Sequence, residues 1–465
     1  MKAVILGAGP CGLTAAWELS RNGVNVTIVE KNAVVGGLCR TTRRDGYSFD
    51  LGGHRFISGD QNLVDDINAL MGGRLLLRDR KSVIRFRNRE YEYPVNLTNI
   101  LSQSTPLMSL NFTLGYVAAT MGLARSSAPE GSFELWIDQR FGRPLNEFFF
   151  KPYTEKLWGI PTSQLSSEWA SQRISLLDAK DAVLKSMRLS RKTPRTYARK
   201  YYYPPGGIGE IFDVMAEEII KHGGEIITGA SPTKLEVDSG RVRHVVIKNR
   251  DGEPRPITGD YYLSTIPLDE LTALIEPISS PLPYRALRFL NITLKGLENL
   301  SDNTWIYTPE KDIIMTRVQE PKRRSPHNAP PDETSVMLEI PCEAGDRVWS
   351  MPDERLLDKA LKDLRKLSFD IAPHITGYFS TYAEKAYPRY ELGYNVMVGK
   401  MRKVVQRVEN LSTLGRQGLF RYIFMDNAML MGRRWACRVL KEQSLEGIDE
   451  IGDEGSFTET NSVTA

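Results

Sequence analysis

The chain has 465 residues, of which 41% are hydrophobic, 25% charged and 9% aromatic, and its formal net charge is +4. This length predicts two lobes, and a small net charge with both signs interspersed gives no reason to expect a nucleic-acid partner. The sequence has no membrane-spanning apolar stretch, no signal-peptide pattern, no CxxC pair and no metal-ligand spacing, so we expect a cytoplasmic protein with reduced cysteines, no transmembrane segment and no metal.

The first elements along the chain are a short apolar strand, a glycine-rich turn and a helix. In the GxGxxG sequence, Gly7 permits the tight turn, Gly9 lets a pyrophosphate approach the backbone, and Gly12 lets helix and strand pack closely. The helix begins at Pro10 and Cys11. Its first amides and the positive end of its dipole would hold a diphosphate.

A second apolar strand ends in Glu30 and Lys31. Glu30 lies 18 residues beyond Gly12, at a distance where a carboxylate can bind a ribose hydroxyl. A solvated strand end is the alternative for Glu30. The strand before the glycines, the helix after them and the acid at this distance predict a Rossmann-type dinucleotide-binding domain, and hence an α/β fold.

Two further glycine pairs follow this unit. The first is followed by an arginine, and its segment contains Gly37, Leu38 and Arg40; the second precedes a histidine and includes Gly53 and His54. A nicotinamide-dependent dehydrogenase has no need of glycines at these places. Glycine suits positions where a side chain would hold the backbone away from a cofactor.

This arrangement resembles the flavoprotein superfamily of amine oxidases, protoporphyrinogen oxidases and UDP-galactopyranose mutases. The resemblance implies FAD as the cofactor. It also implies that the segment with Arg40 contacts the FAD diphosphate and that Gly53 passes beside the isoalloxazine ring. His54 would then stack at the flavin face and tune its electronics. The alternative is that His54 hydrogen-bonds backbone in a tight turn.

The middle of the chain is predicted to begin with a helix at residues 63–71 and a hairpin near residues 83–93, and to continue as helices. The segment containing Tyr153, Lys156 and Trp158 resembles the YTxKxWG segment of UDP-galactopyranose mutases, which helps to wall the substrate pocket. The alternative is a tryptophan that packs between helices beside a surface lysine.

A basic run lies between Lys180 and Lys200. Such a run is typical of a solvated surface or flexible loop, and the alternative is docking of an anionic substrate or of a carrier at a membrane surface. Arg173, just before it, is a candidate for binding a substrate diphosphate.

The next segments return the chain to the cofactor domain. They include a glycine-rich turn, a helix at residues 210–222 and strands. In the superfamily, backbone atoms of one of these strands, near Leu235, contact the adenine. Alternating residues over 285–385 predict a sheet in the substrate lobe, and the Pro-, Lys- and Arg-rich segment 318–333 is expected to be an exposed connector.

The C-terminal block carries a second resemblance. Tyr387 and Tyr390 are expected near the mouth of the substrate pocket, and Arg389 is a candidate for binding a substrate diphosphate. A helix running to about residue 443 follows, and in the superfamily its N-terminus meets the pyrimidine edge of the flavin. Asp426 is therefore expected to be a neighbour of the flavin or ribityl chain, or the N-cap, and Met429 lies one turn further along.

The resemblance also implies a discontinuous domain organisation. The FAD domain is expected from residues 1–95, 201–275 and 386–450, an interleaved α+β substrate domain from 96–200 and 276–385, and a flexible tail from 451–465.

Three functions are open at this point. The first is a mutase-like enzyme acting on a nucleotide- or carrier-linked sugar in polysaccharide or natural-product biosynthesis, with His54, Trp158 and Tyr387 as catalytic candidates. In such mutases N5 of the reduced flavin attacks the anomeric carbon. The second is an oxidase or dehydrogenase of an amine or a protoporphyrinogen-like substrate. The third is a non-catalytic FAD-binding subunit of a biosynthetic complex. A small-molecule substrate and contact with a membrane surface or partner enzyme are compatible with these, and the sequence does not give the oligomeric state.

Overall fold

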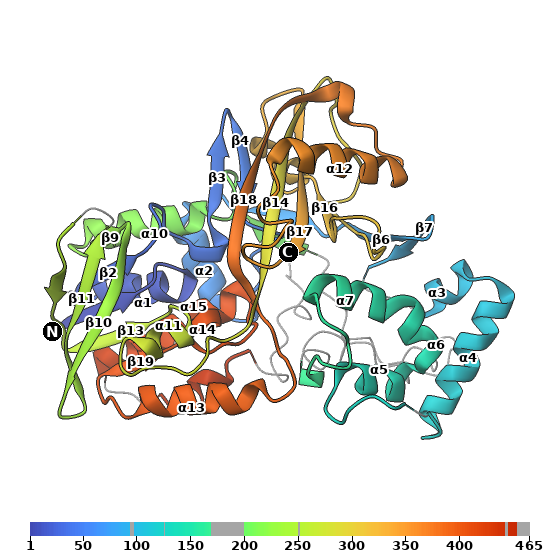
Figure 1. Cartoon of the computed structure of the whole chain (residues 1–465). Helices are drawn as coiled ribbons and strands as arrows, with labels where there is room; N and C mark the ends of the chain where they lie inside the picture. Colours follow the sequence, from blue (N-terminus) through green and yellow to red (C-terminus); the bar gives the residue numbers. More distant parts are fainter. Residues whose placement is uncertain (94–96, 125, 169–199, 250–251, 442–444, 453–465) are drawn as a thin grey trace.

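The computed structural model describes residues 1–93, 97–124, 126–168, 200–249, 252–441 and 445–452. Within them, the N-terminal strand lies in the middle of a five-stranded parallel sheet (Figure 1). Its strand order is β19 (Leu411–Thr413), β13 (Tyr261–Ser264), β1 (Lys2–Leu6), β2 (Asn25–Glu30) and β9 (Glu225–Thr228). The three central strands are almost entirely buried. Their mostly apolar sequences follow from this, because both faces of the sheet are covered: helices pack on one face, and the antiparallel strands of residues 230–257 pack on the other.

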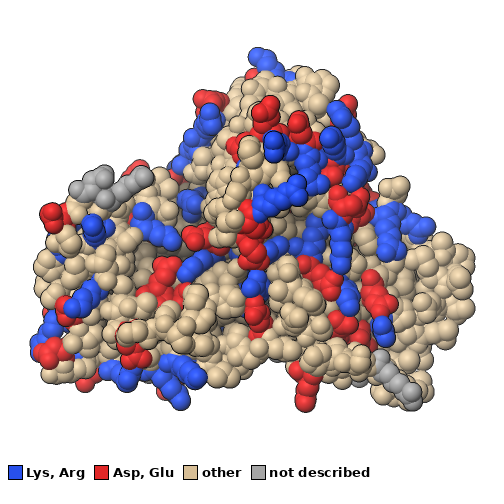
Figure 2. All heavy atoms as spheres, in the orientation of Figure 1, with Lys and Arg blue, Asp and Glu red and all other residues tan. Residues whose placement is uncertain are grey.

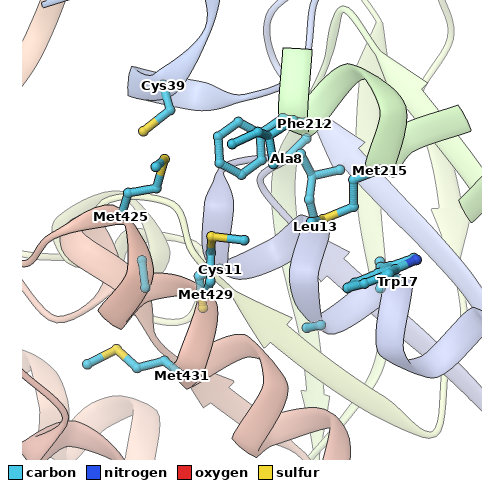
Figure 3. Packing of buried hydrophobic residues seen from close by; sticks show 14 of the residues in the cluster. Ala8, Cys11, Leu13, Trp17, Cys39, Phe212, Met215, Met425, Met429 and Met431 are labelled. Atoms are coloured by element: carbon cyan, nitrogen blue, oxygen red, sulfur yellow. The ribbon is translucent and has the colours of Figure 1, made fainter. Parts of the chain in front are cut away.

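Helix α1 (Pro10–Ser20) packs between α10 (Glu210–Lys221) and α15 (Met425–Lys441), as Figure 3 shows. The predicted helices at these places are confirmed. Glycine makes the contact between α1 and α15 close, because a Cβ built on Gly432 would lie 2.2 Å from the carbonyl oxygen of Cys11. The two ends of the chain therefore share one core.

The second large sheet is mixed and, among the described residues, has seven strands. Its order is β18 (Ile375–Pro388), β14 (Tyr284–Lys295), β17 (Glu333–Cys342), β16 (Arg317–Gln319), β15 (Trp305–Tyr307), β6 (Ser82–Phe86) and β7 (Arg89–Glu92). Helix α12 (Asp353–Lys366) packs on it. The predicted hairpin near residues 83–93 is formed, but it belongs to this sheet, because β6 pairs in parallel with β15. We therefore propose that the first cofactor segment ends near residue 80 and not at 95.

The segment 318–333 is not an exposed connector, and that prediction was wrong. Two of its charged residues, Glu320 and Arg324, are buried and hydrogen-bonded inside the protein. Arg324 is fully buried, and its guanidinium lies 2.7 Å from the buried carboxylate of Asp50. The segment contains the end of β16 and two short 3₁₀ helices, η3 (Pro321–Arg323) and η4 (Pro326–Asn328).

A helical lobe lies beside the seven-stranded sheet, at the right of Figure 1. It consists of α3 (Leu97–Gln103), α4 (Pro106–Thr120), α5 (Phe133–Phe141), α6 (Arg143–Leu145), the π-helical η2 (Asn146–Phe150) and α7 (Lys151–Trp158). Their packed faces are rich in aromatic residues, such as Phe112 against Phe148, with ring centroids 5.2 Å apart.

Smaller elements complete the described structure. Its remaining strands are β3 (Thr41–Arg44) with β4 (Tyr47–Asp50), β5 (Leu76–Asp79) with β8 (Lys200–Tyr203), and the antiparallel β10 (Ala230–Asp238), β11 (Arg241–Asn249) and β12 (Arg255–Ile257). Its remaining helices are α2 (Gln61–Leu70), α11 (Leu268–Ala273), α13 (Tyr394–Gln406), α14 (Gly415–Gly418), η1 (Gly37–Cys39), η5 (Ala372–His374) and η6 (Ile448–Glu450). No helix among the described residues combines the length and apolarity needed to cross a bilayer.

Candidate functional site

A cavity of about 640 Å³ lies at the carboxyl edge of the parallel sheet. Its walls come from the residues that follow β1, β2 and β13, where ligands bind in doubly wound α/β folds. Its volume is within the range of cofactor sites. The predicted cofactor residues that line it are Gly7, Gly9, Pro10, Cys11, Glu30, Lys31, Gly37, Leu38, Arg40 and His54.

The start of α1 is prepared for an anion. Gly9 is its N-cap and offers no side chain to the first-turn amides, so those donors are left for a ligand. A Cβ built on Gly9 meets no protein atom within 4 Å, so the space beside this backbone is open. Gly12 does not line the cavity and has a different role: a Cβ there would lie 2.1 Å from the carbonyl oxygen of Gly7.

Glu30 is held rigidly at the end of β2, where it is 5% exposed. One carboxylate oxygen accepts the backbone N–H of Ala8 at 2.9 Å, and the other accepts both the backbone and side-chain N–H groups of Asn32 at 2.8 and 2.6 Å. Because these donors fix the carboxylate at the cavity wall, it can accept further hydrogen bonds from a ribose.

A second, inner cavity of about 110 Å³ adjoins the first. The lining residues that belong to both cavities are Leu38, His54, Ala383, Arg416, Phe424 and Met425. The polar lining of the inner cavity is rich in arginine and tyrosine: Arg55, Arg80, Arg317, Arg416, Tyr93, Tyr307, Tyr387 and Tyr422. Asp426 is the one carboxylate among the described residues that line it.

Two of these arginines are held in place by the fold. Arg317, on β16, donates through Nε to the buried carboxylate of Glu339 at 3.1 Å. Burial alone would lower the pKa of Arg317, but Glu339 raises it well above its usual range. Arg416 donates through Nη2 to the carbonyl of Ile423 at 2.9 Å, and its guanidinium lies 4.3 Å from the ring centroid of Tyr422. Positioned guanidinium groups of this kind recognise phosphate and carboxylate.

His54 lies where the two cavities meet. Its Nδ1 atom is buried and has no hydrogen-bond partner among the described residues. Burial, followed by the charges of Arg416, Arg324, Arg317 and Arg55, lowers the pKa of His54 to about 3. The imidazole is therefore neutral near pH 7, and its Nδ1 atom is available to form a hydrogen bond with a bound molecule.

Because its pKa is lowered in the folded protein, His54 should make the free energy of unfolding depend on pH. Between about pH 6.5 and pH 3, the unfolded chain binds a proton at His54 that the folded protein does not bind, so stability falls as the pH falls. As the pH is lowered from about 6 to about 4, the unfolding free energy of the His54→Gln apoprotein should fall less steeply than that of the wild-type apoprotein. The two slopes should differ by about 1.4 kcal/mol per pH unit. Urea unfolding across this range measures both slopes. Equal slopes would show that His54 is protonated in the folded protein.

The predicted substrate residues of α7 have mainly supporting contacts. Lys156 is not among the described residues that line either cavity; its Nζ donates to the carbonyls of Thr308 at 2.6 Å and Met315 at 2.5 Å. Burial lowers its pKa to about 7. Trp158, also outside both linings, is fully buried with its ring 5.9 Å from that of Tyr387. The ring of Tyr153 lies 6.0 Å from that of Tyr307. The last two residues thus pack against tyrosines of the inner cavity.

Several C-terminal and cofactor predictions change in the structure. Arg389 forms ion pairs with Glu343 and Glu391, and the hydroxyl of Tyr390 accepts the backbone N–H of Tyr422 at 2.6 Å. Neither residue is among the described residues lining the cavities, and Leu235 and Met429 are not among them either.

Leu235 is buried and donates its backbone N–H to Leu274, whereas Ser231 and Pro232 of the same strand line the cofactor cavity. Met429 is buried in the core between α15 and α1. Gly53 and Asp426 line the inner cavity and not the larger one. Arg173 and the basic run up to residue 199 lie outside the described residues.

Sequence reasoning missed most of the polar lining of the inner cavity. Arg317 and Tyr307 lie in short strands with no glycine motif near them, so no local signal distinguishes them from surface residues. Arg55 follows His54 directly, and Arg416 follows a glycine at the start of a short helix; these two were adjacent to motifs that the sequence does show.

The sequence of this chain matches a known protein family and individual known proteins. Residues 10–440 match the model of the family described as flavin containing amine oxidoreductase. The chain is similar to the chloroplastic prolycopene isomerase of Daucus carota, with 24% identity over 273 residues that cover 53% of this chain and 43% of the isomerase. It is also 34% identical to a 4,4'-diapophytoene desaturase of Staphylococcus aureus over 95 residues, which cover 20% of this chain and 18% of the desaturase. These matches span less than half of either relative.

Solved structures share the fold over far more of the chain. The structure of reduced UDP-galactopyranose mutase covers 100% of both chains, with a TM-score of 0.82 and 23% identity. A putative protoporphyrinogen oxidase from Exiguobacterium covers 95% of this chain and 99% of its own, with a TM-score of 0.72 and 18% identity. At these identities the likeness establishes the fold.

Proposed function

Because this chain belongs to the flavin containing amine oxidoreductase family and is thus an FAD-dependent enzyme, we propose that it acts on an anionic substrate, and specifically on a sugar linked to a nucleotide or carrier through phosphate. The observation that carries this proposal is the set of arginines and tyrosines in the inner cavity. The likeness in fold to UDP-galactopyranose mutase supports the choice of a sugar.

The larger cavity fits FAD. The uncapped start of α1 suits the diphosphate, Glu30 suits the adenosine ribose, and the partnerless Nδ1 of His54 suits the flavin end. When bound, FAD supplies either electron transfer or a nucleophilic N5. We propose that Gly7, Gly9, Glu30 and Arg40 hold the cofactor, with His54 at its boundary with the substrate.

The chain's own side chains would bind and orient the substrate. The lining carries four guanidinium groups and one carboxylate, Asp426, and the buried Glu339 pairs with Arg317. The remaining positive charge favours an anion and disfavours a cationic amine. Burial raises the pKa of Tyr387, so this hydroxyl stays protonated and can donate a hydrogen bond to a sugar oxygen. The inner cavity is smaller than a site for a whole ligand. It would therefore take the reacting ring together with the phosphate next to it, which the arginines would contact, and the rest of the substrate would lie outside it.

A net oxidation is the second candidate, because the relatives include a desaturase. The two reactions differ in electron balance. With anaerobic enzyme, UDP-galactose should give a product sugar only after the flavin is reduced with dithionite, and without net consumption of electrons. Free galactose, which lacks the diphosphate, should not react. Flavin bleaching by an amine or a polyene, with no reaction of the nucleotide sugar, would contradict the proposal.

A pair of variants tests the anion site. Arg55→Met should raise KM for the anionic substrate about 10–100-fold, because a charged hydrogen bond contributes about 1.5–3 kcal/mol. Arg389→Met is the matched control, since Arg389 is paired with Glu343 and Glu391 outside the described cavity linings, and its KM should stay within about threefold of wild type. Steady-state kinetics at equal FAD content measures both. An unchanged KM in Arg55→Met would contradict a role in substrate binding.

A further inference from the structure

Helix α4 presents an apolar stripe to solvent. Its members are Leu107 (77% exposed), Leu110 (56%), Leu114 (60%), Val117 (44%) and Met121 (66%), the last just beyond the helix end. The opposite face is buried against α5 and α6 through Phe112, Tyr116 and Ala119. A second apolar stripe, opposite the buried one, is expected to be buried as well. The stripe is therefore a surface that requires a partner.

The stripe and the sequence on either side of it carry no charge. The sequence has no Asp, Glu, Lys or Arg between Glu92 and Arg125. Figure 2 shows the consequence: the right-hand edge of the molecule, where Figure 1 places α4, is largely tan. When two copies of the same surface meet, like charges on that surface repel each other. The residues of this stripe are uncharged, so no such repulsion arises between two copies of it.

The spacing of the residues in the stripe indicates that its partner is another helix. The stripe's residues are separated by three, four, three and four positions, which is the a/d spacing of a coiled-coil seam. Exposed polar residues, including Asn111, Thr113 and Thr120, border it, so the apolar face is one seam wide. Insertion into a bilayer surface needs a wider apolar face, usually with basic residues beside it.

We propose that α4 pairs with α4 of a second copy of this chain, in antiparallel orientation about a twofold axis at Leu114. The stripe is self-complementary in that arrangement. Leu107 meets Met121 of the partner subunit, Leu114 meets the partner's Leu114, and Leu110 lies opposite the partner's Ala118, one position from the partner's Val117. The seam is about 22 Å long. Because it is shorter than a standard stable interface, the dimer should dissociate in the micromolar range.

The first test is the mass of the FAD-loaded full chain by sedimentation velocity, from about 1 to about 100 µM. We expect a monomer–dimer equilibrium that Leu114→Glu abolishes, with FAD content and circular dichroism unchanged because the side chain is exposed. Ile220→Glu is the matched control: Ile220 is 59% exposed on α10, and its replacement should leave the dimer intact. A wild-type monomer over the whole range would overturn the proposal. So would binding to anionic phosphatidylglycerol vesicles that Leu114→Glu removes from a monomeric protein.

Cysteine cross-linking tests the orientation, in a Cys437→Ser background because the other three cysteines are buried. Leu114→Cys should form an intermolecular disulfide under mild oxidation. Leu107→Cys should not, because antiparallel pairing places the two copies of this residue about 21 Å or more apart. Leu107→Cys combined with Met121→Cys should cross-link. A disulfide in Leu107→Cys alone would show parallel pairing, and no disulfide in Leu114→Cys would refute the contact.

Discussion

Replacing Arg324 with methionine is expected to lower the free energy of unfolding by about 3–5 kcal/mol, because it leaves a buried carboxylate without its counter-charge. The side chains of Arg324 and Asp50 are 0% and 1% exposed, and Nη1 lies 2.7 Å from Oδ2. Asp50 also accepts hydrogen bonds from the hydroxyl of Tyr203 at 2.6 Å and the backbone N–H of Ile208 at 2.9 Å. Nothing in this arrangement can give the carboxylate access to water.

Two controls separate the buried charge from the loss of packing. Asp50→Asn in the Arg324→Met background removes the unpaired charge and should restore at least half of the lost stability. Arg43→Met breaks an exposed pair with Asp213, whose side chains are 45% and 40% exposed, and should change stability by about 1 kcal/mol at most. Urea unfolding monitored by circular dichroism measures all four proteins. An Arg324→Met protein within about 1 kcal/mol of wild type would show that Asp50 is not charged in the fold.

The second large effect is expected at Gly9. Gly9→Ala should weaken FAD binding about 10–100-fold, because its methyl group would occupy the open space beside the start of α1 and cost about 1–3 kcal/mol against the diphosphate. Its φ of −82° and ψ of −178° suit alanine, so the apoprotein should keep its stability. Titration of apoprotein with FAD, followed by flavin fluorescence, measures the affinity.

Gly12→Ala distinguishes a cofactor contact from a packing contact. Its methyl group would lie 2.1 Å from the carbonyl oxygen of Gly7 and 3.1 Å from the side chain of Ile5, so the apoprotein itself should lose stability. The two glycines of one motif should thus separate: one variant weakens the affinity for FAD, and the other weakens the fold. Equal stability losses in both apoproteins would contradict this division.

The first part of the cofactor site could be predicted from sequence because its requirements are local. The tight turn, the close helix–strand contact and the carboxylate at the next strand end involve residues 7 to 30, and glycine is the residue type that such backbone geometry demands. Helix α15 was predictable for a similar reason, since its apolar positions recur at helical spacing.

Neither the inner cavity nor the buried pair of Arg324 and Asp50, which are not among the described residues lining it, could be predicted in the same way. Arg324 and Asp50 are 274 positions apart, and each looks like an ordinary surface charge until its partner is known. The prediction for the α7 segment was limited in a different way. The aromatic rings of this segment do pack beside the inner cavity. The Nζ atom of Lys156, however, donates hydrogen bonds to the carbonyl groups of Thr308 and Met315, in the connection between β15 and β16. A motif thus predicted the neighbourhood of a side chain but not the direction in which it points.

The packing of α1 against α15 has a consequence for how the protein is made. A ribosome synthesises Gly12 some four hundred residues before Gly432, whose missing side chain lets the two helices touch. At about 5–20 residues per second, the nascent α1 waits for tens of seconds with one apolar face uncovered. Until then the cofactor cavity lacks the part of its wall that residues 415–428 supply, so we expect tight FAD binding only after the last helix has been translated.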